Sequence, residues 1–241
     1  PRIGRLMALA AGLQQQFSGP VWAEEKIDGF NVRIARPGKR VLAFTRGGFV
    51  CPFTTDRVPD LLDPALFDAE PDLVVCAEVA GPENPYQEVG PPFVKDDVEL
   101  FAFDLMRLDR PGFLPQGEKM ALFERHRIPS ARVFGRFQPD DVPALQEILR
   151  ELDRGWREGL VFKEGGAGQR RAKYVTGNSN IADIRSTAYN LPELPPDYFT
   201  NRILRLALYR EEVGPHGTVT VERALGAAFL EGLETALRRY R

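Results

Sequence analysis

Lys26 stands in the stretch AEEKIDGFN, which matches the pattern K-x-D-G. A lysine amine is a nucleophile only when it is neutral, and nearby cations favour that state by lowering its pKa. A chemistry that suits such a lysine is attack on the α-phosphate of a nucleoside triphosphate, which displaces pyrophosphate and leaves a phosphoramidate. Because average residue frequencies give K-x-D-G by chance about once in twenty chains of this size, other residues must show whether Lys26 has partners.

This chemistry needs a platform for the base, an acceptor for the ribose hydroxyls and cations for the α-phosphate. Phe103 is a candidate for stacking on the base, and Glu78 is a candidate acceptor for the ribose. Arg46, which precedes Gly47-Gly48, is a candidate for contact with a phosphate. Further charged candidates lie around one predicted hairpin: Glu158, Lys163, Arg171 and Lys173.

Each candidate also has a purely structural interpretation. Taken alone, Lys26 is an ordinary solvated lysine, Phe101 and Phe103 are core residues, and Arg46 belongs to a hairpin turn. The ordered occurrence of all the candidates at predicted strand ends favours the functional interpretation. We interpret Phe101 and Arg33 as structural, whereas Asp104 fits either role. Residues 165–168 lack the frame of a phosphate-binding loop and predict a flexible turn.

The candidates fall into six boxes that follow one another along the chain. They are Lys26-Ile27-Asp28-Gly29, Thr45-Arg46-Gly47-Gly48, Ala77-Glu78-Val79, Phe101-Ala102-Phe103-Asp104, Glu158-Gly159-Leu160-Val161-Phe162-Lys163 and Arg171-Ala172-Lys173. Their order, over most of residues 23–175, resembles the covalent nucleotidyltransferase superfamily of ATP-dependent polynucleotide ligases and mRNA capping enzymes. The resemblance implies an α+β fold in which two antiparallel sheets and flanking helices enclose an ATP groove.

Departures from the superfamily pattern indicate which branch of the superfamily the chain resembles most. Asn31 stands where DNA ligases and capping enzymes usually have arginine, which is similar to RNA ligases. Arg171 stands where lysine is usual, so the charge is kept while the contact geometry differs. The stretches EEKIDGFNVRI, TRGGFVCPFTTDR and NRILRLALYREE resemble thermophilic, archaeal-type, homodimeric RNA ligases that circularise single-stranded RNA. Members of that family are longer at both ends, so we expect an N-terminal module and part of the C-terminal one to be missing here.

The resemblance implies a role for each matching residue. Lys26 forms a lysyl-AMP, and Glu24 or Glu25 positions the adenine or the lysine. The implied nucleotide contacts also include Asp28 and Gly29 of the lysine box, Asn31 and Arg46 on ribose or phosphate, Glu78 on the ribose and Phe103 on adenine. The implied neutralisers of the α-phosphate are Lys163, Arg171 and Lys173, and Glu158 is implied to organise a metal ion through water.

The implied reaction has three steps: self-adenylylation by ATP, transfer of AMP to an RNA 5′-phosphate, and attack by an RNA 3′-hydroxyl with release of AMP. The implied cofactors are ATP and Mg²⁺ or Mn²⁺, with the Mg²⁺ held largely by phosphates and water. The implied partner is RNA with a 5′-phosphate and a 3′-hydroxyl.

Three alternative functions stay open. A DNA ligase differs only in its acceptor. A GTP-dependent, capping-type guanylyltransferase is disfavoured by Asn31 and by the lack of a predicted β-barrel domain. A non-catalytic nucleotide- or RNA-binding module is disfavoured by the retention of Lys26 together with the phosphate-binding cations.

The composition fits a globular protein of one or two domains. Of 241 residues, 43% are hydrophobic and the formal net charge is −2, so any RNA binding is expected to use a local patch and to be modest and salt-sensitive. Cys51 and Cys76 lie in apolar surroundings and are interpreted as reduced core thiols of a cytoplasmic protein, with a disulfide as the alternative. Only two histidines are present, which disfavours a structural zinc site, and no apolar run predicts a membrane span.

Hydrophobic periodicity predicts a strand-rich body with few helices. The predicted strands cover residues 31–34, 41–45, 73–79, 99–106, 159–163 and 171–175, with 130–137 undecided. The predicted helices cover residues 1–17, 142–156, 198–212 and 220–241. Prolines near residues 190–196 indicate a linker, so we predict an adenylyltransferase domain over 1–190 and a helical, dimerising segment over 196–241. In the strand 99–106, alternation predicts Phe101, Phe103 and Leu105 on one face and Ala102 and Asp104 on the other.

Overall fold

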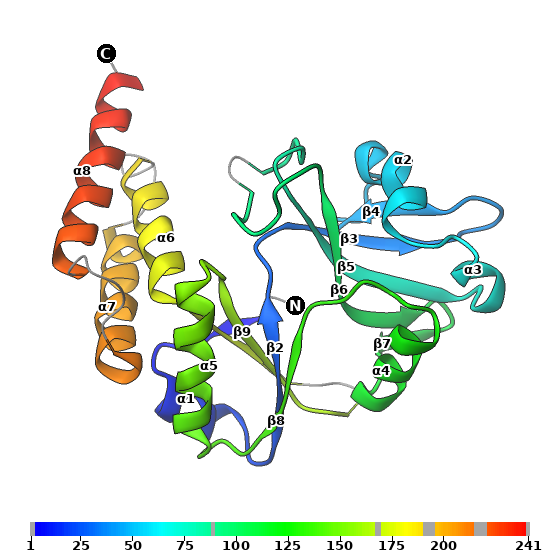
Figure 1. Cartoon of the computed structure of the whole chain (residues 1–241), viewed down its shortest axis with the longest axis horizontal. Coiled ribbons are helices and arrows are strands. Elements are labelled where there is room, and N and C mark those ends of the chain that lie inside the picture. The colour runs from blue at the N-terminus through cyan, green and yellow to red at the C-terminus, as the bar shows by residue number, and fades with distance from the viewer. Residues whose placement is uncertain (1–2, 88–89, 167–169, 190–195, 215–220, 240–241) are drawn as a thin grey trace. The chain divides into compact units, whose positions relative to one another are not determined.

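The computed structural model of the chain describes residues 3–87, 90–166, 170–189, 196–214 and 221–239. The chain divides into two compact units, which are described separately (Figure 1). Unit 1 comprises Pro1–Val21, Arg136–Phe162 and Arg171–Arg241, and unit 2 comprises Trp22–Gly135 and Lys163–Arg170. The linker predicted near residues 190–196 lies almost wholly outside the described residues.

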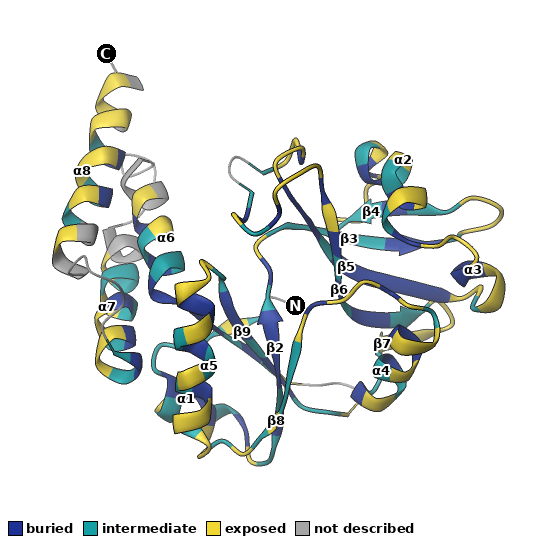
Figure 2. Cartoon of the chain, in the orientation of Figure 1, coloured by how far each residue is buried: buried dark blue, intermediate teal, exposed yellow. Residues whose placement is uncertain are grey.

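Unit 2 is built on an antiparallel sheet with the strand order β4-β3-β5-β6-β7. Its strands are β3 (Phe30–Ala35), β4 (Leu42–Thr45), β5 (Leu73–Ala80), β6 (Glu99–Arg107) and β7 (Arg110–Phe113). Its helices are α2 (Pro52–Leu61), α3 (Leu66–Ala69) and α4 (Gln116–Arg125). All three helices contribute apolar side chains to one core on one face of this sheet, among them Val58, Phe67 and Leu122. Figure 2 shows β5 as largely buried, whereas each helix keeps an exposed outer side.

A β-bulge in β6 changes which side chains share a face of this sheet. Ala102 pairs with Ala77 and Asp104 pairs with Cys76, so Phe103 is an extra residue between them. Leu105 therefore joins Ala102 in the core on the helix-covered face. The predicted grouping of Asp104 with Ala102 is wrong, because strict alternation does not hold across a bulge.

The second five-stranded sheet has the strand order β1-β10-β9-β2-β8. Its strands are β1 (Gly4–Arg5), β2 (Val21–Lys26), β8 (Val133–Phe137), β9 (Gly159–Lys163) and β10 (Arg171–Val175). The first strand pairs in parallel with β10, with Arg5 opposite Lys173. The helices of unit 1 are α1 (Leu9–Gln16), α5 (Val142–Arg154), α6 (Gly177–Tyr189), α7 (Pro196–Val213) and α8 (Val221–Arg239).

Glu212, near the end of α7, links the C-terminal part of unit 1 to its N-terminal part. Its carboxylate accepts hydrogen bonds from the backbone N–H of Leu9 at 2.7 Å and from the hydroxyl of Tyr174 at 2.8 Å. A carboxylate at the N-terminus of α1 satisfies backbone donors that have no partner within the helix and interacts favourably with the helix dipole. The predicted division into residues 1–190 and 196–241 stays a prediction.

Most predicted elements are confirmed, and the predicted α+β class is confirmed with them. The helix predicted over residues 1–17 is wrong at its start, because Gly4 and Arg5 pair as a strand and the helix begins only at Leu9. The sequence patterns did not predict α2, α3, α4, α6 or β7. The reason in α2 is Pro59, which lies inside the helix, and in α6 the opening run Gly177-Asn178-Ser179-Asn180 has low helix propensity.

Cys51 and Cys76 are both buried and are not joined in a disulfide, which confirms their prediction as core thiols. Among the residues that the structure describes, no helix has both the length and the apolar character that crossing a membrane requires.

Candidate nucleotide-binding site

The lysine box begins at the end of β2, where buried acidic residues precede Lys26. Glu24 and Glu25 are buried, and Lys26 is half-buried at the last position of the strand. A Cβ added at Gly29 would lie 3.0 Å from the backbone oxygen of Val79. This close approach to β5 favours glycine at this position of the box.

Glu24 is the centre of a buried ion cluster in unit 2. Its carboxylate lies 2.5 Å from the Nζ atom of Lys119 and 2.6 Å from that of Lys163. The Nζ atom of Lys163 lies 3.1 Å from the carboxylate of Asp104, and Gln116 donates a hydrogen bond of 2.8 Å to Glu24. With two carboxylates and two ammonium groups the cluster is electrically balanced, which burial requires.

The cluster shifts the pKa values of two of its members. Burial raises the pKa of the Glu24 carboxyl, but the positive charges of Lys163 and Lys119 outweigh burial, so the pKa lies below its ordinary value of 4.5. Burial and repulsion from Lys163 lower the pKa of Lys119 from 10.5 to about 8, although Glu24 and Asp104 favour its charged form. Glu24 is thus held as a carboxylate at neutral pH.

Phe103, the candidate for stacking on the base, is held at the bulge by the same lysines. Its backbone oxygen accepts hydrogen bonds from Lys163 at 2.8 Å and from Lys119 at 3.2 Å. The Lys163 ammonium and the Arg33 guanidinium each lie 5.6 Å from the centroid of the Phe103 ring. The structure therefore brings together three predicted site residues, Glu24, Phe103 and Lys163.

Asn31 and Glu78 face each other on paired strands. They are direct partners in the register of β3 and β5, and the Asn31 amide donates a hydrogen bond of 2.8 Å to the Glu78 carboxylate. Arg33 donates to the Asn31 side-chain oxygen at 2.7 Å, which agrees with its structural interpretation. Arg46 lies on the exposed turn after β4, and Asp28 is exposed next to the lysine.

Glu158, Arg171 and Lys173 belong to unit 1, whereas the ion cluster belongs to unit 2. Arg171 and Lys173 are half-buried on β10 and share one side of the strand, with buried Ala172 between them. The backbone oxygen of Glu158 accepts a hydrogen bond of 2.9 Å from Thr176, which ties the start of β9 to the residue after β10.

Replacing Gly159 by alanine is expected to lower the free energy of unfolding by about 2–3 kcal/mol. Gly159 has φ 147°, and an added Cβ would lie 2.2 Å from the backbone oxygen of Tyr174 and 2.8 Å from the Cα atom of Val175. Urea unfolding measures this loss. Gly19→Ala is the matched control, since nothing lies within 4 Å of its added Cβ. Equal stability losses in the two variants would contradict the prediction.

Lys119 and Gln116 were not among the predicted site residues, because the sequence pattern did not predict the helix α4. A signal was present in the stretch from Lys119 to Phe123. Lys119 precedes the buried residues Leu122 and Phe123 by three and four positions, a spacing that aligns them on one face of a helix. A lysine on the buried face of a helix indicates an acidic partner in the interior.

Neither unit forms a protein-built metal centre in its described part, where no group of three or more His, Cys, Asp or Glu side chains is arranged to hold a metal ion. A divalent cation bound through the phosphates of a nucleotide fits this donor set, since Mg²⁺ keeps several water ligands.

A family model described as RNA ligase matches residues 19–175. The chain is 49% identical to a solved structure from Aquifex aeolicus, provisionally assigned as an ATP-dependent DNA ligase, with a TM-score of 0.91 over 100% of this chain and 66% of that one. It is 29% identical to an archaeal ATP-dependent RNA ligase, with a TM-score of 0.87 over 99% of this chain and 64% of that one. An uncharacterized protein of Methanocaldococcus jannaschii is 28% identical over 85% of this chain and 53% of its own length.

These similarities and the motif residues define a nucleotidyltransferase-type ligase fold. The chain belongs to the RNA ligase family, whose match contains every predicted site residue from Glu24 to Lys173. The chain spans about half the length of the curated relative, 53%, and 64–66% of the two solved chains.

Proposed function

We propose that this chain is the nucleotidyltransferase part of an ATP-dependent RNA ligase that works through a lysyl-AMP intermediate. The observation that carries the proposal is the RNA ligase match over residues 19–175, which contains Lys26 and all its predicted partners. The geometry of unit 2 supports it, because Lys26 ends the strand that carries Glu24, and Glu24 lies beside Lys163 next to the ring of Phe103.

In the first step, the Nζ atom of neutral Lys26 attacks the α-phosphorus of ATP. A phosphorus–nitrogen bond forms, the bond from the α-phosphorus to the bridging oxygen breaks, pyrophosphate leaves, and the lysine nitrogen loses one proton to solvent. We assign stacking on adenine to Phe103 and ribose contact to Glu78, which Asn31 holds through a hydrogen bond of 2.8 Å. We assign neutralisation of the α-phosphate to Arg171, Lys173 and Lys163.

In the second step, an oxygen of the RNA 5′-phosphate attacks the same phosphorus and displaces Lys26. In the third step, the RNA 3′-hydroxyl attacks the activated 5′-phosphate, a phosphodiester forms, and AMP leaves. A Mg²⁺ or Mn²⁺ ion bound to the phosphates of ATP would neutralise their charge, and Glu158 would hold such an ion through its water ligands. Both RNA steps use atoms and bonds that the first step and the RNA supply.

Incubation with α-labelled ATP and Mg²⁺, followed by denaturation, tests this function. We expect label on the protein that acid releases and alkali does not, as for a phosphoramidate. Unlabelled ATP is expected to reduce this labelling, whereas unlabelled GTP is expected to leave it unchanged. Competition by GTP instead would favour a capping-type enzyme, and no label with either nucleotide would contradict catalysis by this chain.

A DNA ligase is the second candidate, favoured by the 49% identity to the Aquifex aeolicus structure. Sealing of single-stranded RNA with a 5′-phosphate, compared with sealing of nicked duplex DNA, distinguishes the two candidates.

We further propose that the chain forms a homodimer through its C-terminal helices. Leu230 and Leu237, which are exposed on α8, support this proposal, and light scattering tests it. The two buried cysteines, which form no disulfide, support a reducing, cytoplasmic compartment.

A further inference from the structure

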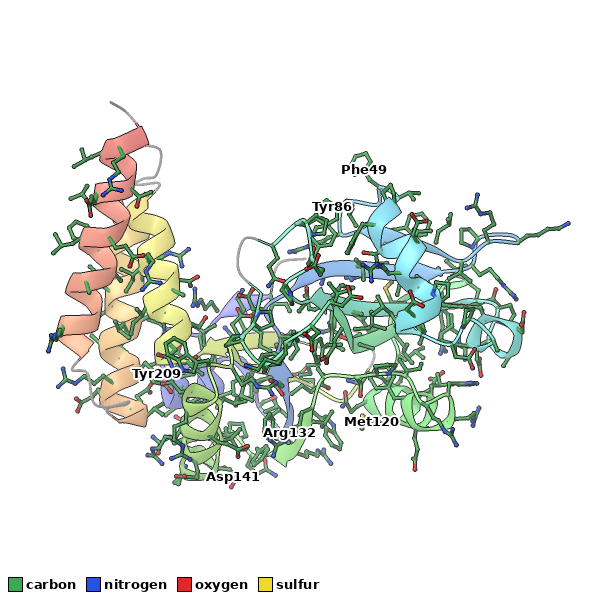
Figure 3. All side chains as sticks on the ribbon, turned by 45° about the horizontal axis from the view of Figure 1, so that its top comes forward. Phe49, Tyr86, Met120, Arg132, Asp141 and Tyr209 are labelled. Carbon is green, nitrogen blue, oxygen red and sulfur yellow. The ribbon has the colours of Figure 1, made fainter. Side chains whose placement is uncertain are left out.

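Unit 2 exposes aromatic side chains outside the predicted nucleotide site. Phe49 is 76% exposed and Tyr86 is 50% exposed, and Figure 3 shows both at the same edge of unit 2. The Tyr86 ring stacks on Phe30 with centroids 4.5 Å apart and meets the ring of Phe53 edge-on at 6.3 Å. We call Phe30, Phe49, Phe53 and Tyr86 the aromatic surface. Exposed apolar side chains that gather into one patch, unlike scattered single ones, are typical of interaction sites.

Hydrogen bonds hold Tyr86 in its exposed position. The buried side chain of Asn84 donates to the backbone oxygen of Val79 at 2.8 Å and accepts from the backbone N–H of Tyr86 at 3.0 Å. The side chain of Gln87 donates to the backbone oxygen of Asp28 at 2.9 Å. The segment that carries Tyr86 is therefore held in place, and a hydrogen bond from Gln87 ties it to the lysine box.

Arginines accompany the aromatic rings. The guanidinium of Arg57 lies 5.5 Å from the centroid of the Phe53 ring and also pairs with Asp97 at 2.5 Å. Arg46 is exposed on the turn that leads to Phe49. Aromatic faces combined with cations are the usual means by which proteins bind single-stranded nucleic acid, because every base has a π-face and every phosphate a negative charge.

We propose that the aromatic surface binds the RNA strand near its reacting end, with bases stacked on Phe49 and Tyr86. The inference rests on the proposed function, in which an RNA 5′-phosphate must reach the lysyl-AMP. Phe30 directly follows the lysine box, and Gln87 bonds to its Asp28, so a base stacked on Tyr86 lies beside the segment that carries Lys26. The proposal commits to single-stranded RNA rather than to a protein partner.

Fluorescence anisotropy with a labelled, 5′-phosphorylated single-stranded RNA at low salt tests this surface. Phe49→Ser and Tyr86→Leu are each expected to weaken binding about fivefold or more, the range of base–aromatic stacking. The dependence of affinity on salt concentration is expected to stay unchanged, because the phosphate contacts remain. Phe49→Ser is the safer variant for folding, since this side chain is largely exposed.

Leu108→Ser is the matched control, because Leu108 is 56% exposed on the turn between β6 and β7 of the same unit. Its RNA binding is expected to equal that of the wild type. Labelling by ATP is also measured on every variant. A failure of the proposed ligase function can then be told apart from a failure of the proposed RNA-binding surface. Weakened RNA binding without any lysyl-AMP supports the surface and contradicts the ligase. The proposed RNA-binding role of the aromatic surface is overturned if both aromatic variants bind RNA like the wild type, or if the wild type shows no detectable binding. It is also overturned if the variants change their oligomeric state while their RNA binding stays the same.

Discussion

Replacing Lys26 by alanine is expected to abolish covalent labelling of the chain by α-labelled ATP. The label requires a nucleophile at the end of β2, and alanine supplies none. Lys26→Arg is expected to abolish it too, because a guanidinium keeps the positive charge but does not lose its proton in proteins. The pair of variants separates nucleophilic attack from simple charge neutralisation, since only the latter survives in the arginine variant.

Because Lys26 is only half-buried, replacing it is expected to affect labelling without unfolding the protein. Loss of a partly exposed lysine is expected to change the free energy of unfolding by no more than about 1 kcal/mol, so both variants should remain folded. Lys95→Ala, at an exposed lysine of the same unit, is expected to label like the wild type. Persistent label on Lys26→Ala would show that another residue is the nucleophile.

Replacing Lys163 by methionine is expected to lower the free energy of unfolding at pH 7 by about 3–5 kcal/mol, the range for breaking a buried ion pair. Methionine keeps much of the volume but removes the ammonium group that contacts both Glu24, at 2.6 Å, and Asp104, at 3.1 Å. Lys119 would then be the single cation beside two buried carboxylates. Urea unfolding measures the loss, and Lys39→Met at an exposed position is expected to change little.

The loss is expected to shrink as the pH falls from 7 toward 4. In the wild type the pKa of Glu24 lies below 4.5, so the stability that Glu24 contributes is complete above 4.5 and is lost as the pH falls through the folded-state pKa. Without Lys163, one of the two cations that lower the pKa of Glu24 is lost, so this pKa should lie higher than in the wild type. Glu24 then contributes less stability in the variant, and the variant has less of it to lose on acidification. A difference that is constant or grows toward low pH would contradict this account.

The same substitution bears on catalysis, because Lys163 also holds the backbone oxygen of Phe103 at 2.8 Å. Labelling by ATP should therefore fall together with stability in Lys163→Met. In Lys26→Ala labelling should fall without loss of stability. This contrast distinguishes a residue that builds the site from the residue that reacts in it.

The sequence alone predicted six of the strands and the order of the six boxes, since both depend on local pattern, whereas it did not predict β1, β2 or β7. Hydrophobic runs bounded by turn residues predicted β5, β6, β9 and β10, and their polar members fell at or near strand ends. Proline and low-propensity residues hid α2 and α6, because tertiary packing stabilises these helices against their local preference.

By itself, therefore, the sequence carried the RNA ligase family, which the match over residues 19–175 shows, and it predicted the K-x-D-G lysine with its acidic and basic partners. Only the tertiary structure decided how charge is balanced around them. Glu24 meets Lys119 and Lys163, which lie 95 and 139 residues away along the chain, and the bulge at Phe103 turns Asp104 toward them. Sequence periodicity predicts which residues are neighbours within one helix or strand, but not which residues meet across the fold. A buried carboxylate instead requires a cation from wherever the fold supplies one.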